Sequence, residues 1–231
     1  VVPQTSGTTN KYFYSNADGY SLYFSVTSSS AKTATLTGCT TTKDTVDINI
    51  PRTVNYNGNN YTITKIGENA FRNQTRIANI DGMKNVTEIG SYAFSDCVKL
   101  KKVTLPKKLD KIGDGAFTGT AIAKIEIPEG VKEIRLETFE NCKKLKEVLL
   151  SKDVRIIGRS AFAGCDNLSS INFDNLEEIG IKAFENNKSL VGELALKNVV
   201  TLGTEALYGC SGITAVSFSD TLQVLGEREA Y

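Results

Sequence analysis

The chain has 231 residues, of which 40% are apolar and 23% charged, so it has enough apolar side chains to fold and is not predicted to be disordered over most of its length. Its 27 basic and 26 acidic residues are mixed along the chain and leave a net charge of +1, which excludes the basic stripe expected of a protein that binds nucleic acid or an anionic membrane. Histidine is absent, which removes the usual general base and the commonest transition-metal ligand, so we expect no enzyme activity, no cofactor and no metal site.

Residues 1–11 are polar and have neither the basic start nor the apolar core of a signal peptide, so they are predicted to form a flexible tail. The sequence contains no run of 18 apolar residues, and we therefore expect no membrane insertion by this segment. Any export signal or lipid anchor is expected upstream of Val1.

Residues 12–62 are rich in aromatic residues and threonine and are predicted to form several strands. Asn57-Gly58-Asn59-Asn60 separates two apolar stretches, as in a β-hairpin. We interpret this region as an N-terminal β-rich cap with a modified first repeat, because the end of a stack of repeats exposes apolar side chains and unpaired strand edges. The other expected strands are Tyr12–Tyr14, Leu22–Val26, Thr33–Leu36 and Val46–Pro51.

Residues 63–231 contain a repeat of 22 or 23 residues. Most copies include the sequence Ile-Gly-x-x-Ala-Phe, although Arg135 replaces the glycine in one of them. We expect the glycine to relieve a tight corner and the alanine to pack under a short helical turn. An alternating stretch such as Ile125-Glu126-Ile127 predicts a strand with one buried and one open face. The final position of the motif is occupied by Phe71, Phe94, Phe117, Phe139, Phe162, Phe184 and Leu207.

A single repeat cannot fold alone. It offers about six large apolar side chains worth roughly 1.5–3 kcal/mol each, whereas ordering its backbone costs roughly 1–2 kcal/mol per residue. Stacked repeats bury both sides of each apolar layer and pair their strands in parallel. The sequence therefore predicts about seven stacked coils, which form a rod on the order of 30–35 Å long.

The motif read from Leu100 to Ile112, Leu-x-x-Val-x-Leu-Pro-x-x-Leu-x-x-Ile, is combined with sequences such as Ala93-Phe94-Ser95-Asp96-Cys97. Together they resemble the BspA-type leucine-rich repeats of surface and secreted bacterial proteins, those of Bacteroidetes among them. The resemblance covers residues 63–226. It implies an α/β repeat solenoid rich in β structure, namely a right-handed leucine-rich-repeat solenoid with a concave parallel sheet, and it implies a role in adhesion.

Four of the five cysteines occupy one position of the repeat, three residues after the phenylalanine or leucine. The other copies have a glutamine, threonine or asparagine there, so we interpret the column as a ladder of side chains that hydrogen-bond buried backbone groups. A disulfide between Cys142 and Cys165 is an alternative, whereas the spacing does not suit a metal site. Cys39 is expected to be buried or unpaired. The four column cysteines are Cys97, Cys142, Cys165 and Cys210.

The strand positions that point away from the core vary between copies and are predicted to form a ligand-binding surface on the concave face. This surface is polar, of mixed charge and without the aromatic anchors typical of strong protein-binding sites, so a plain solvated face is the alternative. The predicted residues are Asn79, Asp81, Lys102, Thr104, Lys124, Glu126, Glu147, Leu149, Ser170, Asn172 and Glu193.

These observations favour a monomeric, non-catalytic binding or adhesion module that is exported to the cell surface or secreted. Its expected partner is a host or bacterial surface protein or glycan, and nucleic acid is not expected to bind. The alternative is a structural spacer that holds another domain away from the cell surface. At Leu225–Tyr231 charged residues replace the expected Ala-Phe, which suits either a minimal polar cap or a boundary within a longer chain.

Overall fold

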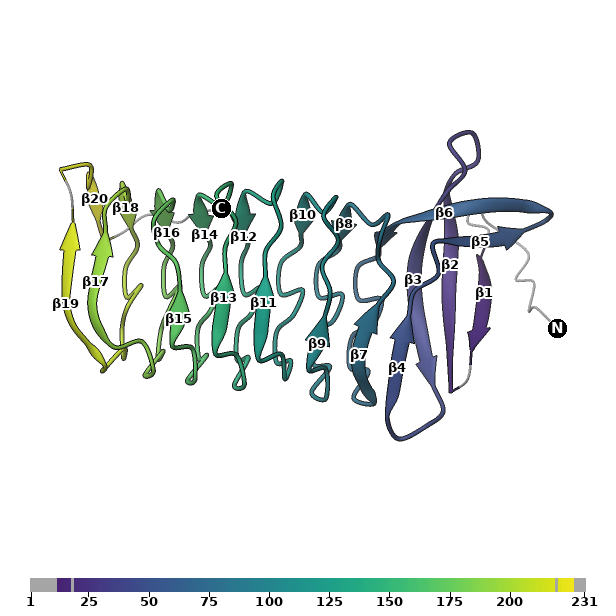
Figure 1. The fold of residues 1–231 in the computed structure, drawn as a ribbon, viewed down its shortest axis with the longest axis horizontal. Coiled ribbons are helices and arrows are strands. Elements are labelled where there is room, and N and C mark those ends of the chain that lie inside the picture. The colour runs from purple at the N-terminus through teal and green to yellow at the C-terminus, as the bar shows by residue number, and fades with distance from the viewer. Residues whose placement is uncertain (1–11, 18, 219, 227–231) are drawn as a thin grey trace.

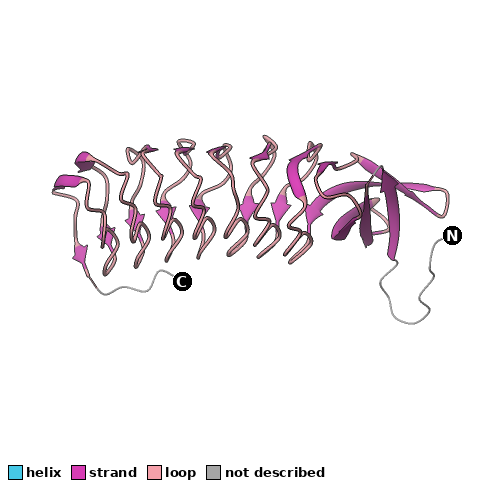
Figure 2. Ribbon diagram, turned by 90° about the horizontal axis from the view of Figure 1, so that it is seen from below, coloured by secondary structure: helices cyan, strands magenta, loops and turns pink. Residues whose placement is uncertain are grey.

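The computed structural model describes residues 12–17, 19–218 and 220–226, and it is an elongated stack of about seven coils (Figure 1). The predicted tail at residues 1–11 and the last residues, 227–231, lie outside the described part. Each coil contains two strands and a turn that carries the repeated phenylalanine, which is replaced by Leu207 in the last coil. Equivalent strands of successive coils pair in parallel and form two ladders along the stack, as Figure 2 shows from another side.

Ladder I consists of the strands that the alternating pattern predicts. From β4 to β13 its strands alternate between buried apolar and outward-facing residues, as in β11, whose central Ile125 is buried. In β15 and β19 the inward-facing apolar residues are only half-buried. The ladder is made of β4 (Val46–Asn49), β7 (Ile77–Asp81), β9 (Lys102–Val103), β11 (Lys124–Glu126), β13 (Glu147–Leu149), β15 (Ser170–Ile171), β17 (Gly192–Leu196) and β19 (Ile213–Phe218).

Ladder II was not predicted. It is built from the Ile-Gly positions, where each strand is only two residues long after the first. The isoleucine that ends each strand from β6 to β16, and Leu202 of β18, are buried in the core. The ladder is made of β6 (Asn59–Ile66), β8 (Glu88–Ile89), β10 (Lys111–Ile112), β12 (Glu133–Ile134), β14 (Ile156–Ile157), β16 (Glu178–Ile179), β18 (Thr201–Leu202) and β20 (Val224–Leu225). We number the coils from coil 1, which holds β4, β6 and Phe71, to coil 7, which holds β17, β18 and Leu207.

The N-terminal strands continue ladder II. β2 (Tyr20–Ser28) pairs antiparallel with both β1 (Tyr12–Ala17) and β3 (Thr33–Thr41), and β3 pairs in parallel with β6. The predicted hairpin is confirmed, because β5 (Thr53–Tyr56) pairs antiparallel with β6 around Asn57 and Gly58, both of which have a positive φ. One seven-stranded sheet therefore joins the N-terminal region to coils 1–3.

A stack of phenylalanine rings forms the centre of the core. The six rings from Phe71 to Phe184 are fully buried, and neighbouring rings lie parallel with centroids 5.0–5.4 Å apart. This spacing follows from the stacking of the coils, since each phenylalanine occupies the same position in its own coil. Offset ring stacking adds to the free energy of burial.

The expectation of an α/β solenoid is wrong, because the described residues contain no helix, and so no helix that could cross a membrane. The predicted helical turns are irregular turns in which two positions of each repeat have a left-handed backbone. In coil 2 these are Tyr92 (φ 54°) and Asp96 (φ 59°), and in coil 4 Glu137 (φ 55°) and Asn141 (φ 56°). A right-handed helix cannot contain such residues. The turns instead hydrogen-bond to the next coil, as Phe94 N does to Ala116 O at 2.8 Å.

The glycine of the Ile-Gly pair allows neighbouring coils to approach closely. A Cβ atom on Gly113 would lie 2.4 Å from Ser91 N and 2.7 Å from Gly90 C, both backbone atoms of coil 2. Its φ is not positive, so the predicted tight corner is not the reason for glycine here. Glycine is needed because the backbone of the preceding coil lies in contact with it. This close approach allows short hydrogen bonds in ladder II, such as Gly113 N to Ile89 O at 2.8 Å.

Both ladders are interrupted between coils 3 and 4, at a place we call the seam. Among the described residues, no strand pairing joins β9 to β11 or β10 to β12. Arg135 occupies the glycine position of coil 4, and Phe117 is followed by one residue fewer than usual before the next apolar position, Ile122. The turns still connect the two coils, with Gly115 N bonded to Leu136 O and Phe117 N bonded to Thr138 O, both at 2.8 Å.

Ladder I has a second gap, between coils 6 and 7, where β15 and β17 belong to different sheets. Here the chain has one residue more than usual between the buried Leu190 and the strand residue Leu194. The extra residue shifts the strand register between Gly192 and Glu193. Ladder II remains paired at this level through β16 and β18.

Candidate functional site

All the residues predicted to bind ligand lie on the strands of ladder I or directly after them. Most of these side chains are exposed, and those of Asn79, Glu147 and Asn172 are half-buried. They share one side of the stack, which we call the open face. The open face is not one continuous sheet, because the two gaps divide ladder I into three short sheets of three, three and two strands.

Ion pairs and hydrogen bonds connect neighbouring coils across the open face. Lys124 Nζ donates a hydrogen bond to Glu147 Oε1 at 2.9 Å and lies 4.0 Å from Glu126 Oε1. The hydrogen bond to Glu147 raises the pKa of Lys124. Asn79 Nδ2 donates to Asp47 Oδ1 at 2.7 Å. These polar side chains are held in defined positions although most of them are exposed.

Asn172 has a structural role in addition to its place on the open face. Its Nδ2 donates to Leu150 O at 3.2 Å, and its Oδ1 accepts a hydrogen bond from Leu150 N at 2.9 Å. The amide thereby continues the pairing of β13 with β15, which ends at Val148 and Ile171. A side chain engaged in this way is less free to contact a ligand than Ser170 or Glu193, which are exposed.

The seam opens as a hollow of about 470 Å³ on the open face. It is lined by Lys102, Thr104, Lys124 and Glu126, so it brings four of the predicted residues together. The side chains come from β9, its continuation and β11, which the missing strand pairing leaves apart. The sequence predicts these residues, but it does not predict that they surround a hollow.

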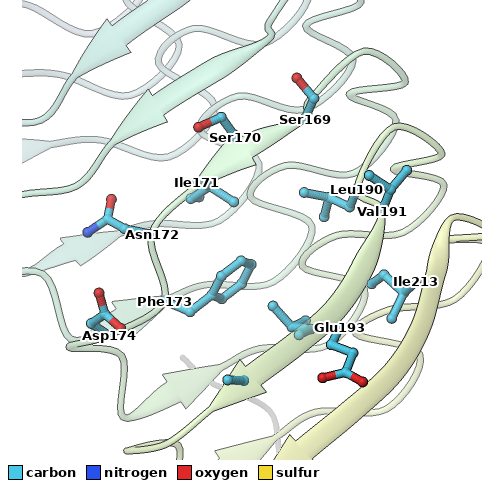
Figure 3. A pocket seen from close by; sticks show the side chains of 12 residues that line it. Ser169, Ser170, Ile171, Asn172, Phe173, Asp174, Leu190, Val191, Glu193 and Ile213 are labelled. Atoms are coloured by element: carbon cyan, nitrogen blue, oxygen red, sulfur yellow. The ribbon is translucent and has the colours of Figure 1, made fainter.

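The second gap forms another hollow, of about 380 Å³, between coils 6 and 7 (Figure 3). Three of the residues predicted for the open face, Ser170, Asn172 and Glu193, line it. Apolar side chains that were not predicted also line it. Val191 is the clearest of these, because 73% of it is exposed. The extra residue in this copy of the repeat was the signal that could have revealed the hollow. This end of the open face combines polar and apolar groups.

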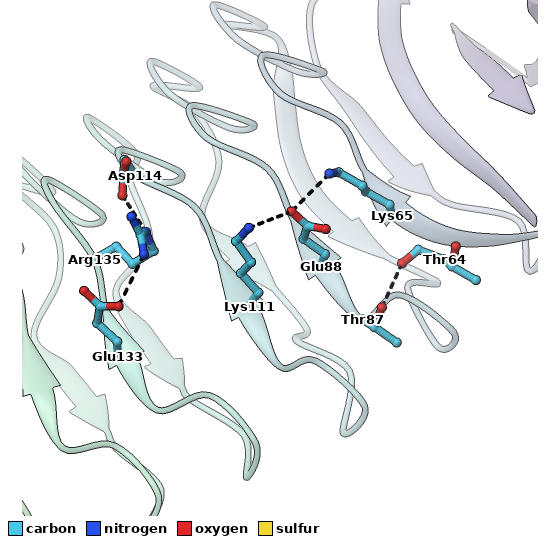
Figure 4. Close-up of polar contacts among 8 residues, drawn as sticks. All are labelled: Thr64, Lys65, Thr87, Glu88, Lys111, Asp114, Glu133 and Arg135. Atoms are coloured by element: carbon cyan, nitrogen blue, oxygen red, sulfur yellow. Dashed lines mark hydrogen bonds and ion pairs between the residues drawn. The ribbon is translucent and has the colours of Figure 1, made fainter. Parts of the chain in front are cut away.

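The ladder II side of the stack also carries ion pairs between coils (Figure 4). Glu88 lies between Lys65 and Lys111, with N–O distances of 3.0 and 3.3 Å. Burial alone would raise the pKa of Glu88, but the hydrogen bonds from both lysines outweigh burial and hold its pKa below the ordinary value. In the same region Thr87 Oγ1 donates to Thr64 O at 3.4 Å.

Arg135 forms an ion pair across the seam, from coil 4 to coil 3. Its Nε donates to Asp114 Oδ1 of coil 3 at 2.7 Å, and its Nη1 lies 3.3 Å from Glu133 Oε2 (Figure 4). The bond to Asp114 raises the pKa of Arg135, and burial raises the pKa of Glu133 despite the nearby guanidinium. A hollow of about 450 Å³ lies beside these groups, lined also by Lys111 and Lys132.

The cysteine column forms the predicted structural ladder. Each column cysteine donates a hydrogen bond to the carbonyl of a phenylalanine in the preceding coil, as Cys142 Sγ does to Phe117 O at 3.1 Å. Asn187 uses its Nδ2 in the same way, with Phe162 O at 2.8 Å. The alternative of a disulfide between Cys142 and Cys165 is wrong, because all five cysteines are free and buried, as expected for Cys39.

We predict that the five thiols of the native protein are nearly unreactive. Burial raises the pKa of Cys142 to about 11 and that of Cys97 to about 12, so the reactive thiolate is scarce at pH 8. Labelling by an aromatic disulfide reagent at pH 8 should be at least about 100-fold slower than labelling of a free thiol. All five should react promptly in denaturant. Rapid labelling of any cysteine in the folded protein would contradict this prediction.

These surfaces carry polar and charged groups that can take part in recognition. Exposed amides, hydroxyls, carboxylates and ammonium groups can hydrogen-bond and ion-pair with a ligand, and the hollows offer concave surface. Within the described part of the chain, no three His, Cys, Asp or Glu side chains are grouped in a way that could hold a metal ion.

Comparisons with known proteins identify similar sequences and folds. The model of the BspA-type leucine-rich repeat region matches residues 64–191 in six copies. A leucine-rich repeat protein of Bacteroides ovatus aligns over 89% of this chain and 77% of its own, with 21% identity and a TM-score of 0.51. The T. pallidum leucine-rich repeat protein aligns over 72% of this chain and 84% of its own, with 19% identity and a TM-score of 0.54. No curated protein matches the sequence.

Proposed function

Since the chain belongs to the family of BspA-type leucine-rich repeat proteins, we propose that it is an exported, non-catalytic binding module whose open face contacts a protein or glycan on another cell. The observation that carries this proposal is that the repeated positions and the variable positions of the coils lie in different places. The repeated apolar positions are buried in coil after coil, whereas the positions that differ between coils lie together on the open face. A surface whose residues vary while its framework repeats is suited to recognition.

The other parts of the proposal rest on the family and on composition. A location at the cell surface or in the medium is what the family resemblance implies, and the absence of histidine supports a role without catalysis. The family also implies the right-handed winding of the coils. Residues 12–62 act as the N-terminal cap in this proposal, since their sheet continues ladder II beyond coil 1. We propose that the protein works as a monomer.

We predict that binding depends on four charged residues of the open face. Purified protein is screened against extracellular-matrix proteins and against host and bacterial glycans, and each hit is repeated with Lys102, Lys124, Glu126 and Glu147 changed to alanine. Binding should weaken by about tenfold or more, because the ion pairs and hydrogen bonds of several charged groups are lost together.

The matched control changes two cations and two acids on the ladder II side, Lys132, Arg155, Glu177 and Glu178, to alanine. This variant should bind as tightly as the unaltered protein. If both variants lose affinity equally, or if the open-face variant keeps its affinity, the binding site is not on the open face.

The alternative function is a structural spacer. The open face has no aromatic side chain among the predicted residues, and such anchors dominate many protein interfaces. The elongated stack in Figure 1 also suits a spacer. A folded protein that gives no hit in the screen would favour this alternative over a binding module.

A further inference from the structure

A groove of about 810 Å³ lies where the chain leaves β4, β7 and β9 in coils 1–3. It adjoins the seam hollow, with which it shares Thr104 and Leu105. Four exposed cations line it, and we call it the basic groove. Each of the three coils contributes at least one cation at an equivalent place, after the end of its ladder I strand. The four residues are Arg52, Lys84, Lys107 and Lys108.

Within the part of the chain that the structure describes, no ion pair balances the positive charge of the basic groove. None of the four cationic side chains forms an ion pair or hydrogen bond with another described residue. The acid that lines the groove, Asp81, accepts a hydrogen bond from Gly82 N at 2.8 Å. Beyond the seam the pattern changes, because Glu129 of coil 4 pairs with Lys152 at 3.3 Å. Along this edge of the stack, the cluster of four cations is therefore a feature of coils 1–3.

The floor of the basic groove is aliphatic. Ile50 and Met83 are 1% and 2% exposed, Pro106 is buried, and Pro51 and Leu105 are half-buried. No aromatic ring is among the described residues that line the groove. Nucleic-acid bases are bound mainly by stacking on aromatic rings, which this floor does not provide. A simple inorganic anion would leave the aliphatic floor without a partner.

We propose that the basic groove binds an acidic peptide segment of a partner protein. The segment lies extended across coils 1–3, with carboxylates on the four cations and aliphatic side chains on the half-buried Pro51 and Leu105. Coils are spaced about 4.8 Å apart and an extended peptide advances about 3.3 Å per residue, so about four residues cross the three coils. Alternate side chains of an extended peptide point in opposite directions, which allows acidic and apolar residues to face different walls.

The test uses a fluorescein-labelled peptide that alternates glutamate and leucine, with both ends capped, and fluorescence polarisation with the full chain. The peptide should bind saturably, and its affinity should fall as salt rises. Changing Lys84, Lys107 and Lys108 to glutamate should weaken binding by about tenfold or more. Changing the same lysines to glutamine should weaken it less, and this milder variant replaces the first if circular dichroism shows that the first is unfolded.

Matched controls separate the basic groove from general charge attraction. Changing Lys144, Lys146 and Lys188 to glutamate alters the net charge equally but should leave peptide affinity unchanged. Equal loss in both variants overturns the proposal, as does a peptide of glutamate and glycine that binds as tightly as the one with leucine. A sulfated glycan that binds the groove while the peptide does not, or no peptide binding by folded protein at millimolar concentration, overturns it as well.

The result can be separated from the test of the open face. A variant with Lys102, Lys124, Glu126 and Glu147 changed to alanine should bind the acidic peptide as the unaltered protein does. If the peptide fails to bind while a surface ligand still depends on those four residues, the basic groove has no such role and the proposed function stands.

Discussion

Changing Phe139 to alanine is expected to lower the free energy of unfolding by roughly 3–5 kcal/mol and to separate the unfolding of coils 1–3 from that of coils 4–7. Phe139 is fully buried and stacks on Phe117 and Phe162, with centroids 5.4 Å away on each side. It lies beside the seam, where neither ladder pairs. Removing the ring therefore weakens an interface that depends on the turns, the core and Arg135.

Urea unfolding followed by circular dichroism measures the loss of stability and the number of transitions. Amide hydrogen exchange shows which coils unfold together. Phe94→Ala is the matched control, because its ring stacks at 5.0 and 5.2 Å between coils that both ladders join. It should lose similar stability in a single transition, since neighbouring repeats with strong interfaces unfold together. A single transition in the Phe139 variant, or two transitions in the Phe94 variant, would show that the seam does not divide the stack.

Changing Gly113 to alanine should destabilise the protein by about 1–3 kcal/mol, although alanine is the smallest possible replacement with a Cβ. The new methyl group would lie 2.4 Å from Ser91 N, and backbone cannot move aside without breaking the ladder. The expected structural result is a second interruption of ladder II, between coils 2 and 3. Faster exchange of the Gly113 amide, which donates to Ile89 O at 2.8 Å, should report it.

Gly158→Ala provides a graded control, because its nearest atoms would lie 3.0 Å away and the loss should be smaller. The reverse substitution, Arg135→Gly, should allow β12 to approach β10. The amides of Glu133 and Arg135 should then exchange more slowly. Equal losses in the two glycine variants, or unchanged exchange in Arg135→Gly, would refute the view that close backbone approach sets the pairing of ladder II.

The number of coils and the composition of the core could be predicted from sequence because Phe71 to Leu207 recur at nearly constant spacing. Ladder II could not, because a strand of two residues such as Glu88–Ile89 is too short to show alternation. The absence of helices was missed for another reason. Tyr92 and Glu137 adopt a left-handed backbone that their residue types do not signal, and stacking against the next coil holds them there.

The residues of the open face were predicted, but their grouping was not. Lys102 and Lys124 share a hollow because one residue is missing before Ile122 and because Arg135 keeps the neighbouring backbones apart. Both departures are visible in the sequence, yet only the structure shows that they act at the same interface. The basic groove was also missed, since Arg52 and Lys84 align only after the coils are stacked.

The seam has a mechanical consequence for a protein that is pulled along its long axis. Between coils 4 and 5 tension is shared by β11–β13, β12–β14 and the turns, whereas at the seam the strands transmit none of it. The load there passes through the bonds of the turns, the contact of Phe117 with Phe139 and the link from Arg135 to Asp114. Under stretching, the stack should therefore part first at the seam, leaving the N-terminal sheet with coils 1–3 as one block and coils 4–7 as the other.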